Sequence, residues 1–327
     1  MIRHLRFGAL AAVAAVAAPL FTTQAAELRM IGGFPENFVF TTEIAHPFMK
    51  RVEEESGGAL TVSLQGPDAV PTFEQFEPVQ AGVFDLLFTH PAYHAGVSAL
   101  GLSIDAIDPD PAKRRDAGVI AFIDDHYRQH NLKLIAAPAT GSEGFRYFMK
   151  APIEGTPAMQ GLKIRGTVSY HPMIEALGGT PVVMSGGEVY SALQKGVIDG
   201  AAWGLTGAKD FKWYEVADYM ADPTFGQVGV MIFMNLESWE ALSAEEQAML
   251  TRVGREIETA SVERFDLLAK EETAALLDLG MKMTAFAPEE AERFDALWAD
   301  GVWSVSTAKS DAATELRALA QEAGLTP

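Results

Sequence analysis

Two stretches of this sequence alternate short strand patterns with short helix patterns, and no other feature restricts the possible folds as strongly. In the first stretch, Phe40, Ile44, Phe48 and Val52 recur every four positions, as on one face of a helix. The mostly apolar run 83–88 is typical of a strand that is covered on both faces. The predicted strands and helices of this unit are, in order, 28–31, 40–55, 60–64, 72–82 and 83–88. This order predicts an α/β fold with a parallel sheet and helical crossovers.

The second stretch repeats the same order further along the chain. Its predicted elements are 161–165, 171–177, 181–184, 188–194 and 197–202. The glycines of 141–144 separate the two units, so we expect two lobes with a cleft between them. We assign 27–143 and about 231–270 to lobe I, and 144–230 and about 271–327 to lobe II. Ligands of open α/β sheets bind beyond the carboxyl ends of the strands, where functional residues should lie.

Two capping boxes mark predicted helix starts. Thr72-Phe73-Glu74-Gln75 predicts a short helix that ends at Gly82, and Ser243-Ala244-Glu245-Glu246 predicts a much longer one. Helical spacing continues from Ser243 to Leu279, which at 1.5 Å per residue would span roughly 55 Å and exceed one small lobe. A single long helix is favoured, and two consecutive helices broken near 258–261 are the alternative.

Residues 1–26 have the features of a secretory signal: two arginines, an apolar run over 7–21, and small residues before a polar boundary. The apolar run is shorter than the about 20 residues that cross a bilayer, and no later stretch qualifies as a span. We expect cleavage near Ala25/Ala26, which leaves 327 − 26 = 301 residues in the periplasm. An uncleaved membrane anchor is the alternative.

Charge and cysteine content exclude several classes of function. The chain has 25 basic and 44 acidic residues, so it lacks the basic surface that nucleic acid requires. Loss of the two signal arginines would change the net charge from −19 to −21. Cysteine is absent, which excludes disulfides, thiolate metal ligands and a thiol nucleophile.

Catalytic and metal-binding motifs are absent or incomplete. The sequence has no Gly-x-Ser-x-Gly elbow, and 204–209 lacks the spacing of a phosphate loop. His90 and His94 are four apart, but Pro91 and the absence of a third ligand nearby argue against a metal site. We therefore expect no catalytic residue, no metal and no cofactor.

Clusters of acidic residues have structural interpretations. Asp105, Asp108 and Asp110 lack the central glycine and terminal glutamate of a calcium loop, so we expect them to cap a helix that begins near Pro111. The glutamate run 53–55 and the pair Glu271–Glu272 are expected on solvated helix faces.

Two arginines lie in apolar segments, Arg146 within 144–149 and Arg165 at the end of 162–165. A guanidinium is always charged and presents a planar fork that matches a carboxylate. Arg165 is expected at the carboxyl end of a strand and just before a helix, where it could bind an anion beside backbone N–H groups. An internal salt bridge to a distant acid is the alternative for both arginines.

These segments carry a resemblance to a known family. The sequences of 161–165 (GLKIR), 177–182 (LGGTPV) and 188–200 (EVYSALQKGVIDG) resemble the periplasmic solute-binding subunits of TRAP transporters. The likeness extends to 52–58, 80–85 and 239–247 and covers essentially the whole mature chain. It implies a two-lobed, type II-like periplasmic binding protein with a long helix across both lobes, which closes over an organic anion, usually a carboxylate.

The resemblance also implies site residues. The carboxylate-clamping arginine of the family falls on Arg165, and a second arginine used by some members falls on Arg146. Members that hold a metal beside the ligand have a glutamate where this chain has Ala202, so a bridging metal is not expected here. The apolar surroundings favour an aromatic or largely apolar carboxylate. The cleft residues that we expect to contact it are Phe34, Phe38, His90, Tyr93, Trp203 and Phe225, and a place in the core is the alternative for each aromatic ring.

The sequence therefore predicts a transport protein that is not an enzyme. We expect a monomer that captures a small organic acid in the periplasm and delivers it to the membrane subunits of a TRAP transporter. A binding protein of similar fold that serves an ABC importer or a sensor is one alternative. A secreted hydrolase is another, although the sequence offers no nucleophile constellation for it.

Overall fold

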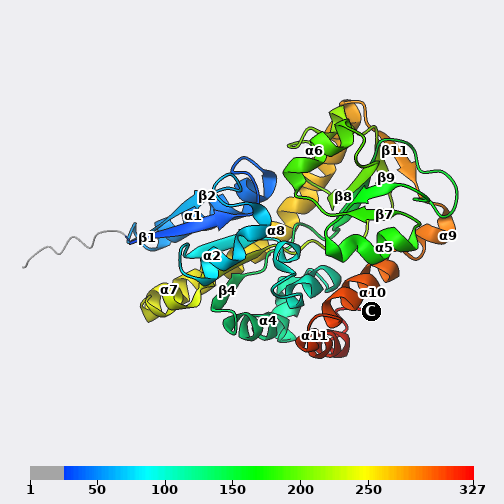
Figure 1. Cartoon of the computed structure of the whole chain (residues 1–327). Helices are drawn as coiled ribbons and strands as arrows, with labels where there is room; N and C mark the ends of the chain where they lie inside the picture. The colour runs from blue at the N-terminus through cyan, green and yellow to red at the C-terminus, as the bar shows by residue number, and fades with distance from the viewer. Residues whose placement is uncertain (1–25) are drawn as a thin grey trace, which may run out of the picture.

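The computed structural model describes residues 26–327, which form two lobes of mixed α/β structure (Figure 1). The predicted signal segment lies outside the described residues except for Ala26, where the first strand begins. Within 26–327, no helix combines the length and the apolar character needed to cross a bilayer. Each lobe contains one sheet, in agreement with the predicted two-lobed α/β fold.

Lobe I is built on a five-stranded sheet with the order β2-β1-β3-β10-β4. Strand β1 pairs in parallel with β2 and β3, as predicted, whereas β10 lies antiparallel between β3 and β4. The strands are β1 (Ala26–Gly32), β2 (Leu60–Gln65), β3 (Leu86–Thr89), β4 (Leu132–Ala136) and β10 (Met231–Asn235). The helices are α1 (His46–Glu55), α2 (Phe76–Gln80), α3 (Pro111–Asp116), α4 (Val119–Arg128) and α7 (Leu236–Glu240), with the π-helix η1 (Thr41–Ala45) and the 3₁₀ helices η2 (Thr72–Glu74), η3 (Pro91–His94) and η4 (Leu100–Ala106).

Lobe II is built on a six-stranded sheet with the order β11-β9-β5-β8-β6-β7. Strand β6 pairs in parallel with β7 and β8, and β5 lies antiparallel to β8 and β9. The strands are β5 (Phe145–Met149), β6 (Lys163–Arg165), β7 (Thr180–Val182), β8 (Gly200–Gly204), β9 (Tyr219–Asp222) and β11 (Lys282–Ala285). The helices are α5 (His171–Ala176) and α6 (Gly186–Gln194), with the 3₁₀ helices η5 (Val168–Tyr170) and η6 (Trp213–Glu215).

The predicted capping box at Thr72 is wrong, because its two side chains bind the end of β1 instead. The Thr72 hydroxyl donates to the Gly33 carbonyl at 3.3 Å, and Gln75 Nε2 donates to the Gly32 carbonyl at 2.9 Å. Gln75 precedes α2 without capping it through its side chain. These bonds fix the chain where it leaves β1, immediately before Phe34.

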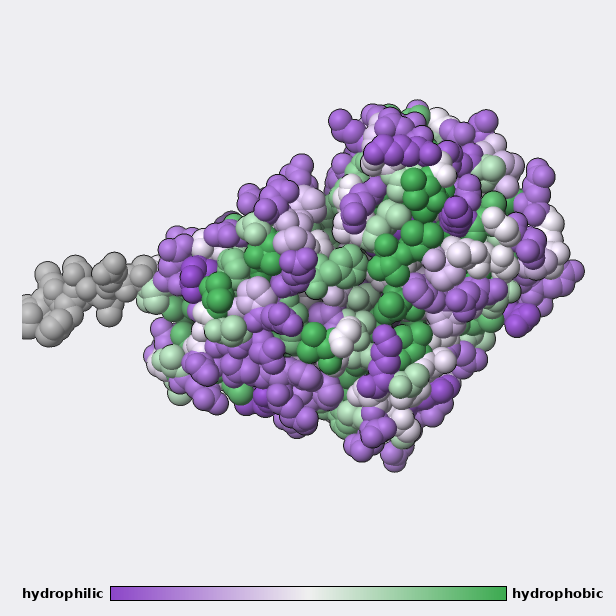
Figure 2. All heavy atoms as spheres, in the orientation of Figure 1, coloured by the Kyte–Doolittle hydropathy of each residue, from purple (hydrophilic) through white to green (hydrophobic). Residues whose placement is uncertain are grey.

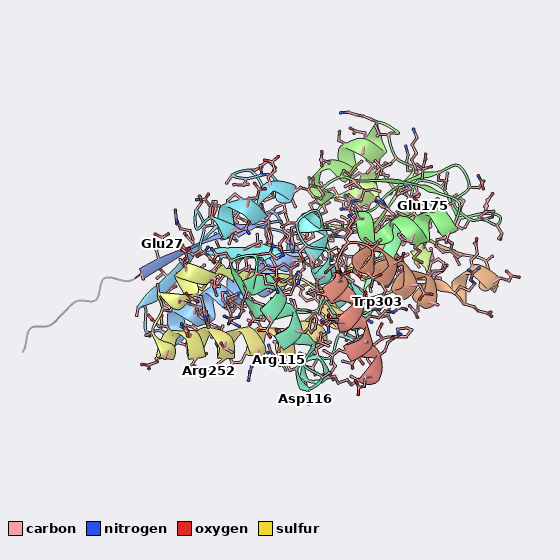
Figure 3. The ribbon with its side chains drawn as sticks, turned by 60° about the horizontal axis from the view of Figure 1, so that its bottom comes forward. Glu27, Arg115, Asp116, Glu175, Arg252 and Trp303 are labelled. Atoms are coloured by element: carbon pink, nitrogen blue, oxygen red, sulfur yellow. The ribbon has the colours of Figure 1, made fainter. Side chains whose placement is uncertain are left out.

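Helix α8 (Ala244–Asp278) is a single 35-residue helix, about 52 Å long, so the alternative of a break near 258–261 is excluded. Ser243 and Glu246 form the predicted capping box at its start. In Figure 1 the helix runs from beneath lobe I to lobe II. Its first two thirds are bound to lobe I by salt bridges, including Arg252–Glu55, Glu258–Arg115 and Arg264–Glu43. Figure 3 labels Arg252, which belongs to α8, and Arg115, which belongs to α3 of lobe I.

The last third of α8 is bound to lobe II through Glu272. Its carboxylate accepts the backbone N–H groups of Gly207 at 2.8 Å and Lys209 at 2.9 Å. The prediction of a solvated face is therefore wrong for Glu272, and burial raises the pKa of its carboxyl. Helix α8 thus holds the loop that follows β8 in place.

The chain passes between the lobes three times: through 137–144, through 223–230, and through α8 into β11. The final helices are α9 (Pro288–Ala291), α10 (Phe294–Thr307) and α11 (Asp311–Glu322). Helix α10 packs against α5 of lobe II and η4 of lobe I, and α11 packs against α4 and η4. Figure 2 shows a mostly hydrophilic surface that is hollowed between the lobes, with hydrophobic side chains along this junction.

Candidate functional site

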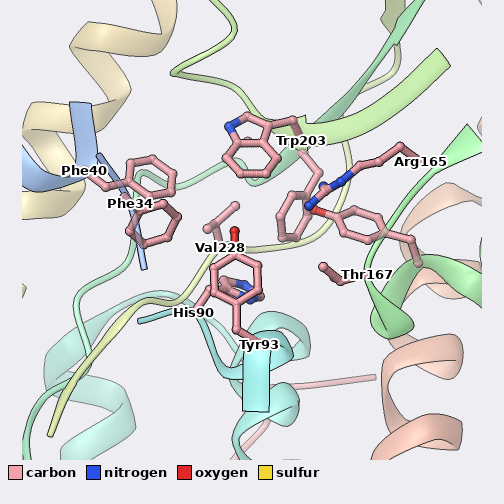
Figure 4. Close-up of a pocket in the computed structure, with 11 residues that line it drawn as sticks. Phe34, Phe40, His90, Tyr93, Arg165, Thr167, Trp203 and Val228 are labelled. Atoms are coloured by element: carbon pink, nitrogen blue, oxygen red, sulfur yellow. The ribbon is translucent and has the colours of Figure 1, made fainter. Parts of the chain in front are cut away.

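A cavity lies between the lobes, at the carboxyl ends of β1, β3, β6 and β8, where the fold predicts ligand binding. Figure 4 shows side chains of both lobes pointing into it. Its free volume is about 20 Å³, which is room for about one water molecule. The lining residues are Phe34, Phe40, His90, Tyr93, Phe145, Arg165, Thr167, Tyr170, Trp203, Gly204 and Val228. Five residues predicted from the sequence are thus brought together: Phe34, His90, Tyr93, Arg165 and Trp203.

Arg165 supplies the positive charge of the cavity and is almost completely buried. Its Nε and Nη2 donate to the Met184 carbonyl at 3.0 Å, and its Nη1 donates to the Ala202 carbonyl at 2.9 Å. The guanidinium also lies over the Trp203 ring, 4.7 Å from the ring centroid. A guanidinium has five N–H groups, so one on each terminal nitrogen is left over. Within residues 26–327, Arg165 forms no salt bridge with a carboxylate.

Two tyrosines flank this guanidinium, Tyr93 from lobe I and Tyr170 from lobe II. Burial raises the pKa of Tyr93 to about 12, although the positive charge of the neighbouring Arg165 opposes the rise. Burial likewise raises the pKa of Tyr170 well above its ordinary value. Both side chains therefore remain neutral phenols near pH 7, which can donate and accept hydrogen bonds beside the charge.

Both ring nitrogens of His90 lie close to groups of lobe I. Its Nδ1 accepts the Ala92 backbone N–H at 3.2 Å. Nε2 lies 3.1 Å from Asp105 Oδ2, and the fully buried Asp105 also accepts the Gly229 N–H at 2.9 Å. His90 consequently presents ring carbons to the cavity.

Aromatic rings form the walls of the cavity. In lobe I the Phe34 ring packs edge-on against Phe40, with centroids 5.1 Å apart. In lobe II the Phe145 ring packs edge-on against Tyr170 at 5.0 Å. An apolar, water-poor environment of this kind strengthens the attraction between the single guanidinium and an anion.

Arg146 does not line this cavity. Successive side chains of a strand point to opposite faces, and on β5 Phe145 faces the cavity while Arg146 faces a separate groove against α8. There Arg146 Nη2 donates to Asp222 Oδ1 and Nη1 donates to Thr273 Oγ1, each at 3.2 Å. This is the internal salt bridge that the sequence analysis left open for both arginines.

Phe225 does not line the cavity either. It lies behind the cavity, where its ring packs 5.0 Å from Tyr147 and 5.3 Å from Trp298.

Sequence reasoning missed six lining residues: Phe40, Phe145, Thr167, Tyr170, Gly204 and Val228. The period of two along β5 could have pointed to Phe145 once Arg146 was placed on the other face. Thr167 and Tyr170 follow Arg165 closely, so they share its position at the end of β6.

Other side chains singled out in the sequence have structural roles. His94 Nε2 lies 2.8 Å from the Tyr127 hydroxyl, and burial lowers the pKa of His94 to about 3. Asp110 caps α3 by accepting two backbone N–H groups, as predicted, whereas the prediction is wrong for Asp105, which accepts the Gly229 N–H instead. Among residues 26–327, no group of three or more His, Cys, Asp or Glu side chains could hold a metal ion.

Two α/β lobes joined by three crossing segments around a buried cationic cavity define a solute-binding protein. Comparison with known sequences identifies the family. The sequence profile of the bacterial extracellular solute-binding proteins, family 7 (DctP), matches residues 35–304, and the chain belongs to this family. A monocarboxylate 2-oxoacid-binding periplasmic protein of Nostoc is 27% identical over 75% of this chain and 70% of its own length. A solute-binding protein of Albidiferax ferrireducens is 24% identical over 89% of this chain and 88% of its own length.

Solved structures share the fold. An extracytoplasmic solute receptor of Bordetella pertussis binding pyroglutamic acid has a TM-score of 0.80 at 18% identity, covering 91% of this chain and 100% of that one. A TRAP periplasmic solute-binding protein of Desulfovibrio salexigens with bound orotic acid has a TM-score of 0.80 at 19% identity, covering 91% and 98%. A similar protein of Pseudoalteromonas atlantica with bound sodium and pyruvate has a TM-score of 0.81 at 17% identity, covering 92% and 94%. The predicted resemblance to TRAP periplasmic solute-binding proteins is confirmed.

Proposed function

We propose that this protein captures a small monocarboxylate with an apolar or aromatic body and that Arg165 clamps its carboxylate. The observation that carries the proposal is a buried guanidinium with two N–H groups that the backbone carbonyls do not use and no carboxylate partner among residues 26–327. The carbonyls of Met184 and Ala202 hold the fork in place, so little side-chain freedom is lost when an anion binds.

The lining favours one carboxylate over two. Arg165 is the arginine or lysine among the lining residues, and the other polar side chains are three hydroxyls, the Trp203 indole and His90, which lies 3.1 Å from Asp105. A second carboxylate would be buried without a charged partner, which is costly. The names of the Nostoc relative and of the pyruvate- and pyroglutamate-bound structures agree with a small monocarboxylate. We propose that the ligand takes the place of the Tyr93 hydroxyl at Arg165.

The direct test is to replace Arg165. Loss of one partner of a buried charged pair costs about 2–5 kcal/mol, so Arg165→Gln should weaken binding roughly thirtyfold to thousandsfold. Calorimetry with pyruvate, pyroglutamate, orotate and benzoate measures the affinities. Arg146→Lys is the matched control and should leave the dissociation constant within about threefold, because Arg146 lies outside the cavity. Unchanged affinity in Arg165→Gln would exclude the clamp.

We further propose that the chain is exported, cleaved near Ala25/Ala26, and works as a monomer that delivers its ligand to TRAP membrane subunits. Membership of family 7 supports this placement. Intact mass and light scattering of the secreted protein test cleavage and oligomeric state. Uptake of ligand by membrane vesicles that contain TRAP subunits should require the added protein. If the protein instead serves an ABC importer or a sensor, adding it should not stimulate this uptake. Bound ligand recovered chemically unchanged would argue against a hydrolase.

A further inference from the structure

A short segment of lobe I inserts into lobe II beside the cavity. Phe38, which lies just before η1, is buried although it belongs to a loop. Its ring stacks on Phe211 of lobe II at 4.7 Å and meets Trp203 edge-on at 6.1 Å. These rings come from segments far apart in the sequence and from different lobes, so the contact forms only when the lobes are together.

Glycine makes room for the inserted ring. A Cβ at Gly207 would lie 2.3 Å from Phe38 Cζ, and the φ of +103° at this position is unfavourable for other residues. The same Cβ at Gly207 would lie 3.2 Å from Nε1 of the Trp203 indole. At the opposite end of this indole, a Cβ at Gly186 would lie 2.6 Å from Cη2. Trp203, Gly207 and Phe211 therefore form a socket, here called the Phe38 socket, that has space for one ring and little more.

A hydrogen bond next to the ring joins the same two segments. The backbone N–H of Val39 donates to Asp210 Oδ2 at 3.0 Å. The loop that carries the Phe38 socket is itself held by Glu272 of α8, which accepts the N–H groups of Gly207 and Lys209. The socket is thus a fixed part of lobe II, and Phe38 with Val39 is the part that must enter and leave it.

The socket shares Trp203 with the ligand cavity. Phe38 meets the indole edge-on, and the guanidinium of Arg165 lies over the indole ring at 4.7 Å from its centroid. Withdrawal of Phe38 would free one side of Trp203 and so loosen the surface on which the guanidinium rests. We propose that Phe38 is a positioning residue: its insertion holds the lobes closed and fixes Trp203 against Arg165, so that the anion clamp is complete only in the closed protein.

This inference rests on the proposed function only in assigning the clamp to Arg165, and its main test needs no ligand. The absence of cysteine allows one spin label in each lobe, at the exposed positions Lys50→Cys and Lys195→Cys. Pulsed electron resonance on the ligand-free protein then measures the distribution of distances between lobes. Phe38→Ala should shift this distribution to longer distances, and Phe122→Ala, which removes a half-buried ring of α4 in lobe I, should not.

Ligand kinetics provide the second readout, with pyruvate and pyroglutamate as probes. Phe38→Ala should raise the dissociation rate constant about tenfold while the association rate constant changes by less than about threefold, since the lost ring contacts stabilise only the closed form. Gly207→Ala places a methyl group of lobe II in the Phe38 socket, so this variant should also raise the dissociation rate constant. Arg165→Lys should weaken binding without changing the ligand-free distances, so failure of the clamp and failure of the socket give different results.

The proposal is overturned if folded Phe38→Ala keeps both the distance distribution and the dissociation rate of the wild type. If Phe38→Ala does not fold, as judged by circular dichroism, Phe211→Ala decides the question in the same two assays. Wild-type distances in that variant would equally exclude a role of the socket in closure.

Discussion

At the scale of single residues, burial determines whether a titratable side chain is charged. His94 is packed against Phe76, with ring centroids 4.8 Å apart, and bonded to the Tyr127 hydroxyl. Burial lowers the pKa of His94 from its ordinary value of 6.5 to about 3. The folded protein therefore binds fewer protons at this site than the unfolded chain when the pH lies between about 3 and 6.5. The contribution to stability is complete above pH 6.5 and is lost as the pH falls toward 3.

We therefore predict that His94 makes the protein acid-sensitive. Between pH 8 and pH 5, this residue alone should lower the free energy of unfolding by about 2 kcal/mol. Urea unfolding of the wild type and of His94→Gln at both pH values measures the effect. The loss on acidification should be smaller in His94→Gln by this amount, and an equal loss in both proteins would contradict the assignment.

The residues of the site could be predicted only in part. The place of Arg165 at the cavity was predictable, because a charged side chain in an apolar strand needs a partner and the strand end lies at the cavity. Arg146 has the same local signature, but its partner Asp222 is 76 residues away. His90 was correctly placed at the cavity, yet its bonds to Ala92 and Asp105 depend on tertiary structure that no local pattern contains.

At the scale of elements, α8 shows how tertiary contacts reverse a local preference. Gly254 lies inside this helix, where alanine normally stabilises by about 1 kcal/mol. A Cβ at this position would, however, lie 2.5 Å from the carbonyl oxygen of Ile135 in β4. The glycine lets the helix backbone approach the sheet of lobe I closely.

We expect Gly254→Ala to destabilise the protein by about 1–3 kcal/mol, because backbone atoms cannot yield as a flexible side chain would. The matched control is Gly187→Ala in α6, an exposed position where a Cβ meets nothing within 4 Å. This control should be neutral or slightly stabilising. Thermal unfolding of both variants gives the comparison, and stabilisation by Gly254→Ala would refute the packing argument.

Element prediction succeeded where the signal was local. The capping box at Ser243 and the helical period up to Leu279 were enough to define α8. The suspected break near 258–261 does not occur, because Glu258 is buried and accepts the Ala137 N–H and pairs with Arg115. The sequence pattern alone cannot show whether polar residues such as Glu258 end a helix or are buried inside it with a partner from another element.

At the scale of the whole molecule, two sheets are joined by three chain crossings, one of which is the long helix α8. The two-lobed α/β fold was predictable from the repeated strand and helix order. The insertion of β10 between β3 and β4 was not, because antiparallel pairing with a strand about 140 residues away leaves no mark on local periodicity.

A ligand that contacts both lobes should stabilise the whole chain. At 100 times its dissociation constant it adds about 2.7 kcal/mol to the free energy of unfolding, provided that it binds only the folded state. Chemical denaturation with and without pyroglutamate or pyruvate measures this gain in the wild type. Arg165→Gln at the same ligand concentration should gain much less, and equal gains would show that binding does not use Arg165.

The small cavity between the lobes has a kinetic consequence. With a free volume of about 20 Å³ and walls from both lobes, it is too small to admit or release an organic acid unless the lobes move. Escape must wait for an opening event that the protein undergoes by itself. In a chase experiment, the exchange of labelled for unlabelled ligand should therefore reach a plateau rate that further competitor does not increase, and this plateau equals the opening frequency of the protein.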